Sequence, residues 1–249
     1  RHYNNCRLWT FKKGCYVSFR PETVTAYQGM LFSIYGAYDD THYSDEDLMF
    51  RLYESMAKCF ETVRKEEYET IAERIPHLLS WLCAICNRKK IDLAEAVWHK
   101  YPNVCPYGLE VSGCICITRE LVYAPSLAEL LRFRNDRSHI PGRFKEFQEM
   151  FARIYGPVNK VKSIVAVLCH LAEEIGEVGE AYRLGNKEGM REEIADVFAW
   201  LCGVATRLGA HLEAVAWDAY PGVCNTCREK ICICPPPRAM SIGPLRSPR

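Results

Sequence analysis

Apolar residues recur at three- and four-residue spacing along most of the chain, a pattern typical of amphipathic helices. The alternation typical of strands is scarce. The pattern predicts four pairs of helices: 25–35 with 143–155, 45–64 with 158–184, 68–87 with 188–208, and 91–100 with 210–219. The sequence therefore predicts an all-α fold.

The helices pair in this way because the chain carries an internal repeat. Residues 48–105 align with residues 167–224 at a constant offset of 119. The offset superposes Trp81 on Trp200, Cys83 on Cys202, Trp98 on Trp217, Tyr101-Pro102 on Tyr220-Pro221, and Cys105 on Cys224. A period of this length indicates two copies of one folded unit rather than a solenoid of short repeats.

The repeat predicts how the chain is divided. Units this small bury only a modest share of their surface alone, so we expect two four-helix modules packed as a pseudo-dimer. The predicted divisions are an N-terminal extension at 1–24, a first module at 25–118, a linker at 119–142, a second module at 143–234 and a disordered tail at 235–249. The linker is expected to contain one helical turn around 127–133, and each module is expected to end in a cysteine-rich knuckle.

Composition narrows the classes of function. Apolar residues make up 49% of the 249 residues and charged residues 25%, as in ordinary globular proteins. A net charge of +1 argues against a surface built to bind nucleic acid or membranes, and no apolar run is long enough to span a bilayer. The first residue is Arg1 and no basic-then-apolar leader follows it, which leaves a removed signal open.

Four acidic residues of the second copy form the main candidate site. Glu174 and Glu177 are three residues apart, as are Glu193 and Asp196. Three-residue spacing places both members of a pair on one helix face, and consecutive helices joined by a short turn pack antiparallel. The two pairs can therefore face each other and offer the oxygen ligands that Mg²⁺ or Mn²⁺ prefers.

The alternative is that these carboxylates form an ordinary solvated helix face. Two features favour a metal site. Glu193 lies beside Val197 and Trp200 at the edge of the apolar stripe, where an unpaired carboxylate is costly. The first copy has lost all four acids while keeping the apolar positions, and carries Ser55, Lys58, Arg74 and His77 in their places. We therefore expect that the first module has lost a chemistry that the second retains.

The spacing of these acids resembles that of a known family. Glu173-Glu174-Ile175-Gly176-Glu177, then fifteen residues, then Glu193-Ile194-Ala195-Asp196 is similar to the ExxE, spacer, ExxD signature of the MazG-like all-alpha nucleoside triphosphate pyrophosphohydrolases. The resemblance covers about residues 148–220. It implies Mg²⁺-dependent hydrolysis of a nucleoside triphosphate to the monophosphate and pyrophosphate. It also implies that Glu174, Glu177, Glu193 and Asp196 are the catalytic metal ligands. Family members commonly pair four-helix modules, so the degenerate first copy would be a built-in partner.

Basic residues are the candidates for binding the phosphates. Many family members place basic or amide residues just after the second acidic helix, whereas this chain reads Trp217-Asp218-Ala219-Tyr220 there. The first copy has Lys100 at the position of Ala219. The substrate-binding candidates are therefore Lys58, Arg74 and Lys100 from the first copy, and Lys160 and Lys162 before the acidic helix. The alternative for Lys58 and Arg74 is that they fill the lost site and pair with local acids.

Cysteines gather at the end of each copy. The second copy ends in Cys224, Cys227, Cys232 and Cys234, and two close pairs of thiolates can hold a structural zinc ion. The first copy ends in Cys105, Cys114 and Cys116, with Gly108 in the place of Cys227. A zinc ion there needs a fourth ligand, for which the candidates are Cys6, Cys15, Cys86 and His99. Disulfides, thiols without a metal, or a redox pair at Cys224 and Cys227 are the alternatives.

The fourteen cysteines also bear on the compartment. Several lie inside apolar helical patterns, where cysteine acts as a small hydrophobic residue, and the rest have spacings typical of metal sites. This layout favours a reducing compartment and hence a cytoplasmic protein. The leading hypothesis is a Mg²⁺-dependent nucleotide pyrophosphohydrolase with structural zinc. The alternative is a non-catalytic nucleotide- or protein-binding scaffold, and further homodimerisation stays open.

Overall fold

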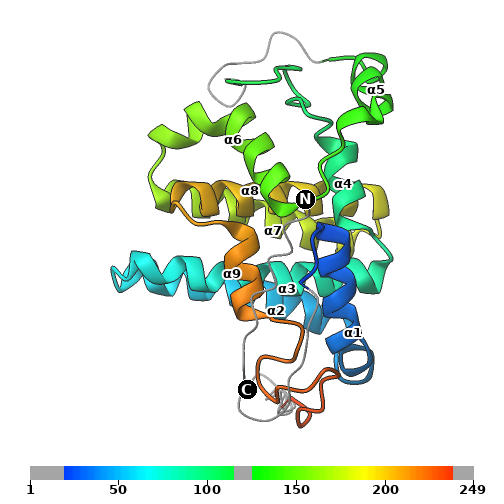
Figure 1. The fold of residues 1–249 in the computed structure, drawn as a ribbon, viewed down its shortest axis with the longest axis vertical. Helices are drawn as coiled ribbons and strands as arrows, with labels where there is room; N and C mark the ends of the chain where they lie inside the picture. Colours follow the sequence, from blue (N-terminus) through cyan, green and yellow to red (C-terminus); the bar gives the residue numbers. More distant parts are fainter. Residues whose placement is uncertain (1–19, 115–124, 238–249) are drawn as a thin grey trace, which may run out of the picture.

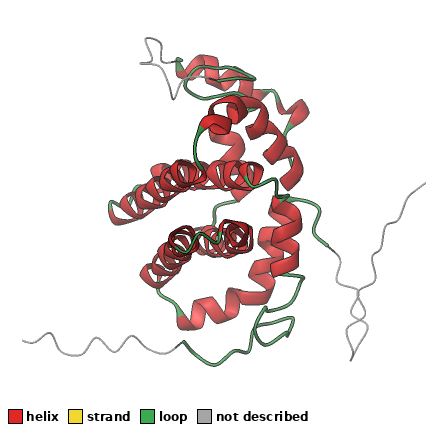
Figure 2. Cartoon of the chain, turned by 90° about the vertical axis from the view of Figure 1, so that its left-hand side faces the viewer, coloured by secondary structure: helices red, strands yellow, loops and turns green. Residues whose placement is uncertain are grey.

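The computed structural model describes residues 20–114 and 125–237, and within these ranges the protein is helical without any strand (Figure 2). The predicted all-α class is thereby confirmed. Cys6, Cys15, Cys116, most of the predicted N-terminal extension and the end of the predicted tail lie outside the described residues. The helices are α1 (Val24–His42), α2 (Asp45–Arg64), α3 (Ile71–Lys89), α4 (Leu93–Lys100), α5 (Leu127–Asn135), α6 (Phe144–Val161), α7 (Ile164–Arg183), α8 (Lys187–Arg207) and α9 (Leu212–Ala219).

Helix starts are set by short polar side chains that accept the first unpaired backbone N–H groups. Ser44 caps α2 in a reciprocal capping box with Asp47, and Ser163 accepts from Ala166 N at the start of α7. Asn186 caps α8 in the same way through Gly189 N. α2 and α8 begin and end within one residue of the predicted 45–64 and 188–208. The predicted start of α7 at 158 is wrong: residues 158–161 continue α6, and α7 begins at Ile164, where Ser163 caps it.

Two helices are longer than predicted. α1 continues to His42, and α6 passes through Pro157 to Val161. A proline inside a helix leaves the carbonyl four residues earlier without its usual partner. That carbonyl, of Arg153, accepts a hydrogen bond of 3.0 Å from Gly113 N, and the next one, of Ile154, accepts 2.8 Å from Cys114 N. The cost of Pro157 is therefore offset by binding the first cysteine segment.

The short last helix of each half packs against the other half. α4 contacts α8, and α9 contacts α3. The Tyr27 hydroxyl of α1 donates to the carbonyl of Ala216 in α9, across 3.1 Å. In Figure 1, α7 and α8 cross the molecule as one layer above α2 and α3, and the two cysteine-bearing segments lie at opposite ends. One continuous apolar core joins the two layers.

Residues 119 or 120 apart repeat the same local contacts. Leu93 N donates to Gln28 Oε1 at 2.9 Å, and Leu212 N donates to Gln148 Oε1 at 3.0 Å. Left-handed backbone positions recur as well: φ is +58° at Lys90 and +67° at Gly209. The backbone thus repeats at the spacing found in the sequence. Within the described residues, every helix is too short or too polar to span a lipid bilayer.

Candidate functional site

Three of the four predicted carboxylates converge between α7 and α8. One carboxylate oxygen from each of Glu174, Glu177 and Glu193 lies within 4.8 Å of the other two. The helices pack along their length, and the three-residue spacing turns both glutamates of α7 toward α8. The structure thus brings three of the four acidic side chains together between these two helices.

Asp196 lies next to this group and is held by the other half of the chain. Its side chain is only 7% exposed. One oxygen accepts a hydrogen bond from the Tyr101 hydroxyl, and the other pairs with the Lys100 ammonium. Lys100 Nζ is also 3.9 Å from an oxygen of Glu193. A cation from the end of α4 therefore sits at the edge of the carboxylate cluster.

Crowding of negative charge changes the protonation of the cluster. The pKa of Glu174 is raised to about 7, by burial first and then by the charges of Asp196, Glu177 and Glu193, against the hydrogen bond from Trp200. Burial likewise raises the pKa of Glu193 to about 7, opposed by Lys100. Burial raises the pKa of Asp196 although Lys100 lowers it. Carboxylates that repel one another in this way are suited to binding a cation.

Further side chains orient the glutamates. Trp200 Nε1 donates to Glu174 Oε1 at 3.1 Å, and the Trp200 ring stacks on His170 with centroids 4.7 Å apart. Lys162 Nζ lies 2.9 Å from His170 Nε2, which places this lysine at the rim of the site. Lys160 is exposed at the end of α6 and has no described contact with the carboxylates. Of the two lysines expected before the acidic helix, Lys162 is the one linked to the site.

Lys58 and Arg74 lie in a different place. They line a cavity of about 260 Å³ between α2 and α3, together with Ser55 and His77. None of the four acids of the second copy lines this cavity. Of the three basic residues of the first copy considered as phosphate ligands, the structure brings only Lys100 to the acidic site.

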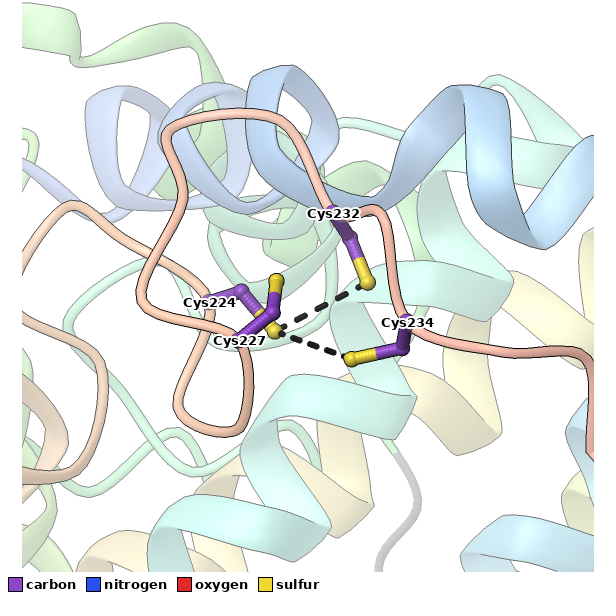
Figure 3. Close-up of side chains that lie close together, drawn as sticks. All are labelled: Cys224, Cys227, Cys232 and Cys234. Carbon is purple, nitrogen blue, oxygen red and sulfur yellow. Dashed lines mark hydrogen bonds between the residues drawn. The ribbon is translucent and has the colours of Figure 1, made fainter.

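The second cysteine cluster forms after α9 and packs on α1. Figure 3 shows the side chains of Cys224, Cys227, Cys232 and Cys234 directed toward one another. Sulfur atoms are 3.7 Å apart between Cys224 and Cys232 and 3.8 Å apart between Cys224 and Cys234. A tetrahedron with zinc–sulfur bonds of about 2.3 Å has edges of about 3.8 Å. These two distances match such an edge, and all four sulfur atoms lie within 4.8 Å of one another, so the cluster could hold a metal ion.

The surroundings of Cys224 lower the pKa of its thiol. Burial opposes the thiolate, but the backbone N–H groups of Cys227 and Thr226 outweigh it and lower the pKa of Cys224 to about 6. Thr226 N lies 3.5 Å from the sulfur. Cysteines in the described part of the chain form no disulfide.

The first cluster contains a residue that the sequence analysis missed. Cys105 and Cys114 meet Glu110, and the three ligand atoms lie within 4.8 Å of one another. The two described candidates for the fourth ligand are elsewhere: His99 meets Glu188 and Glu192, and Cys86 is fully buried in the core. Gly108 stands where the second copy has Cys227, and Glu110 lies two residues later. The missing cysteine was the sequence signal that another nearby residue could be the ligand.

Tyr101, Tyr107 and Trp200 were also missed as site residues. Tyr107 lies beside the carboxylates: burial raises its pKa to about 12, Lys100 opposes the rise, and the charges of Asp196, Glu174 and Glu193 add to it. Tyr101 and Trp200 have the same residue type at the equivalent position of the other copy, which is typical of core residues. Only the exchange of α4 between the halves reveals that Tyr101 and Tyr107 reach the acidic site.

These features define a helical protein with a carboxylate site suited to a divalent cation. Residues 162–220, which span α7 to α9, match the family model of the MazG nucleotide pyrophosphohydrolase domain. The match contains all four acidic residues, so the resemblance seen in the sequence is confirmed for this segment. Searches of curated proteins and of solved structures each gave no match.

Proposed function

We propose that this protein is a Mg²⁺-dependent nucleotide pyrophosphohydrolase that cleaves a nucleoside triphosphate to the monophosphate and pyrophosphate. The observation that carries the proposal is the convergence of Glu174, Glu177 and Glu193 inside the segment that matches the MazG domain. Three carboxylates with oxygens this close repel one another unless a cation lies between them. An all-oxygen donor set of this kind suits Mg²⁺ or Mn²⁺.

The chain's own residues have distinct roles in the proposed site. Glu174, Glu177, Glu193 and Asp196 would hold the cation, which when bound supplies polarisation of the phosphoanhydride and activation of water. Trp200 fixes the orientation of Glu174 through its N–H donor. Hydrogen bonding to a ligating carboxylate is the arrangement that tunes such sites in other proteins.

Cationic side chains bind the substrate phosphates in this proposal. Lys100 presents its ammonium at the carboxylate cluster, and its side chain is 12% exposed, which leaves an edge open to solvent. Lys162 reaches the rim of the same site beside His170. We assign both to the phosphate chain of a nucleotide bound at the carboxylates. Lys160, Lys58 and Arg74 are assigned no contact with this substrate.

We further propose that the chain is a tandem pseudo-dimer with divisions at 25–118 and 143–234. The support is the recurrence of contacts at an offset of 119 and the exchange of α4 and α9. In this arrangement Lys100, Tyr101 and Tyr107 of the degenerate module complete the acidic site of the other. The first module thus has a function even without acids of its own.

Structural zinc is proposed for both cysteine clusters, which hold the ends of the modules in place. Cys224, Cys227, Cys232 and Cys234 supply four thiols to the second site. A site with four thiolates has no open position for water, so it serves structure and not catalysis. Because thiols without disulfides persist in reducing compartments, we propose a cytoplasmic location.

The test is metal-dependent turnover of the full chain. Pyrophosphate and phosphate release would be measured with a panel of canonical, deoxy and modified triphosphates, with Mg²⁺ or Mn²⁺. We expect pyrophosphate release that Glu193→Gln reduces about 100-fold or more, since loss of a ligand exceeds the loss of an outer partner. Glu180→Gln is the matched control, because Glu180 is an exposed glutamate of α7 that pairs with Arg183.

A second candidate is a nucleotide- or protein-binding scaffold without turnover. The observation in its favour is the ion pair of Lys100 with Asp196, because this ammonium competes with a metal ion for the fourth carboxylate. The same assay decides between the two. Absence of turnover on every triphosphate, with folded wild type and retained zinc, would favour the scaffold.

A further inference from the structure

The cavity of the first half occupies the position that the acidic site occupies in the second. Ser55, Lys58, Arg74 and His77 stand at the offset of 119 from Glu174, Glu177, Glu193 and Asp196, and all four line the cavity of about 260 Å³. Its wall also includes Tyr220 from the second half. Tyr220 contacts His77 Nδ1 at 2.8 Å, as Tyr101 contacts Asp196. The two sites therefore share one architecture and differ in charge.

The cavity lining carries three cations, Arg51, Lys58 and Arg74, and two acids, Glu54 and Asp39. Arg51 and Lys58 share Glu54, at 2.8 Å and 3.4 Å, and burial raises the pKa of Asp39 to about 7. Within the described residues Arg74 forms no ion pair, and its buried Nε has no hydrogen-bond partner. An arginine N–H that is buried and unpaired costs free energy that a bound acceptor would recover. The lining is therefore suited to binding an anion with several oxygen acceptors.

The remaining surface of the cavity suits a flat ring. Trp81 and Tyr35 line it together with Tyr220, and Asn87 and Asn225 offer amide groups. Burial lowers the pKa of His77, and the charges of Arg74 and Lys58 lower it further, so this histidine stays neutral beside the cations. Sites for small ligands usually start at roughly 300 Å³, which this cavity approaches.

We propose that this cavity binds a phosphate-bearing anion of the nucleoside phosphate class, directly through Arg74, Lys58 and Arg51 and without a divalent metal. Arginine forks and lysine ammonium groups match phosphate oxygens in charge and geometry. Tyr220 and Asn225 belong to the segment after α8, so a bound ligand contacts both halves of the chain. The degenerate half is then a second nucleotide site, independent of whether the acidic site turns over.

The test is calorimetric titration of the full chain with inorganic phosphate, pyrophosphate and a nucleoside monophosphate, in a buffer to which no divalent metal is added. We expect binding that Lys58→Gln weakens about 5-fold and Arg74→Gln about 10-fold or more. Tighter binding of the nucleoside monophosphate than of phosphate would identify the ring as part of the ligand, and equal affinity would assign the cavity to the phosphate group alone.

Two controls separate this proposal from the acidic site. Glu193→Gln should leave the titration unchanged, and Lys145→Gln should do so too, because Lys145 is exposed and pairs with Glu149. Lys58 is half exposed, so its substitution tests the cavity even where Arg74→Gln lowers stability. No binding at millimolar ligand, or affinity unchanged in Lys58→Gln and Arg74→Gln, overturns the proposal.

An independent observation concerns the first cysteine cluster. Glu110 Oε2 is buried and has no hydrogen-bond partner, although it lies beside the thiols of Cys105 and Cys114. A Cβ placed on Gly108 would lie 1.9 Å from this oxygen. Gly108 is the position of Cys227 in the other cluster, so the carboxylate occupies the space of the missing side chain.

We infer that Glu110 is a metal ligand together with Cys105 and Cys114. Carboxylate oxygen, like thiolate sulfur, is a regular ligand of Zn²⁺. A bound cation would also satisfy the buried oxygen, which otherwise carries an uncompensated desolvation cost. The second cluster has no such need, because Glu229, the equivalent residue, is exposed and four thiols are present.

Zinc content of the full chain tests this inference, by mass spectrometry after dialysis against a chelator and by absorption of the Co²⁺-substituted protein. We expect Glu110→Gln to lose one equivalent of metal at a chelator concentration about 10-fold lower than wild type, and Glu229→Gln to behave as wild type. Gly108→Cys combined with Glu110→Ala should restore retention and add a thiolate to the Co²⁺ spectrum. Wild-type retention in Glu110→Gln would overturn the assignment.

Discussion

Asp196 and His77 are equivalent residues, and each is contacted by an equivalent tyrosine of the other half. Tyr101 donates to Asp196, and Tyr220 meets His77 at 2.8 Å. The tyrosines are alike, while the groups that they contact differ in charge. At this position a buried carboxylate of the acidic site stands where the first half has an imidazole.

Trp200 is the residue whose substitution best tests the geometry of the carboxylates. Trp200→Phe keeps an aromatic ring against His170 but removes the N–H that donates to Glu174. We expect Mn²⁺ affinity and turnover to fall about 10- to 100-fold, as for other partners of metal ligands. Titration of Mn²⁺ by electron paramagnetic resonance measures the first effect. Trp81→Phe, at the equivalent position of the first half, should change neither.

The raised pKa values predict how pH affects metal binding. The pKa values of Glu174 and Glu193 are about 7 in the folded protein, against an ordinary value of 4.5. The metal-free folded state therefore binds more protons than the unfolded state between about pH 4.5 and 7, so its unfolding free energy falls as pH rises through that window.

Protons and metal compete for the same oxygens, so Mg²⁺ should raise the melting temperature more at pH 8 than at pH 6. Thermal unfolding with and without Mg²⁺ measures the difference. Glu193→Gln should show a smaller shift at pH 8. An equal shift at both pH values in the wild type would contradict the assignment of the raised pKa values to the metal ligands.

Among the helices, the spacing of side chains was readable from the sequence, but some boundaries and the packing partners were not. The spacing of Glu174 and Glu177 predicts their common face, whereas the start of α7 after Ser163 was predicted too early, at 158. The passage of α6 through Pro157 was missed because the segment that satisfies Arg153 O comes from residue 113, far away in the chain. The exchange of α4 and α9 is a tertiary feature, so Tyr101 could be placed at the site only in three dimensions, whereas the repeat already made Lys100 a candidate.

The turns after α3 and α8 both contain a residue in the left-handed conformation, but the residue types differ in how easily they adopt it. Lys90 has φ of +58° after α3, whereas Gly209 has +67° after α8. This conformation costs a residue with a Cβ roughly 1–2 kcal/mol. Glycine avoids that cost but loses more conformational entropy on folding, which offsets part of the difference. Lys90→Gly should therefore raise the unfolding free energy by about 0.5 kcal/mol, and Gly209→Lys should lower it by about 1 kcal/mol. Urea denaturation measures both, and opposite signs would refute the argument.

At the scale of the molecule, the two halves depend on each other. α4 covers α8 and α9 covers α3, and buried residues of both halves form one core. Neither half can unfold without exposing the apolar face of the other. We expect a single unfolding transition, with tryptophan fluorescence and far-ultraviolet circular dichroism coinciding. Two separated transitions would show that the halves are independent domains.

The central claim is that the acidic half cleaves the bond between the first and second phosphates of a nucleoside triphosphate. Phosphorus nuclear magnetic resonance of one reaction, with Mg²⁺ and the full chain, observes this bond directly. The account predicts nucleoside monophosphate and pyrophosphate in equal amounts, with neither formed by Glu177→Gln at a comparable rate. Inorganic phosphate with a nucleoside diphosphate, or an unchanged triphosphate, would contradict it.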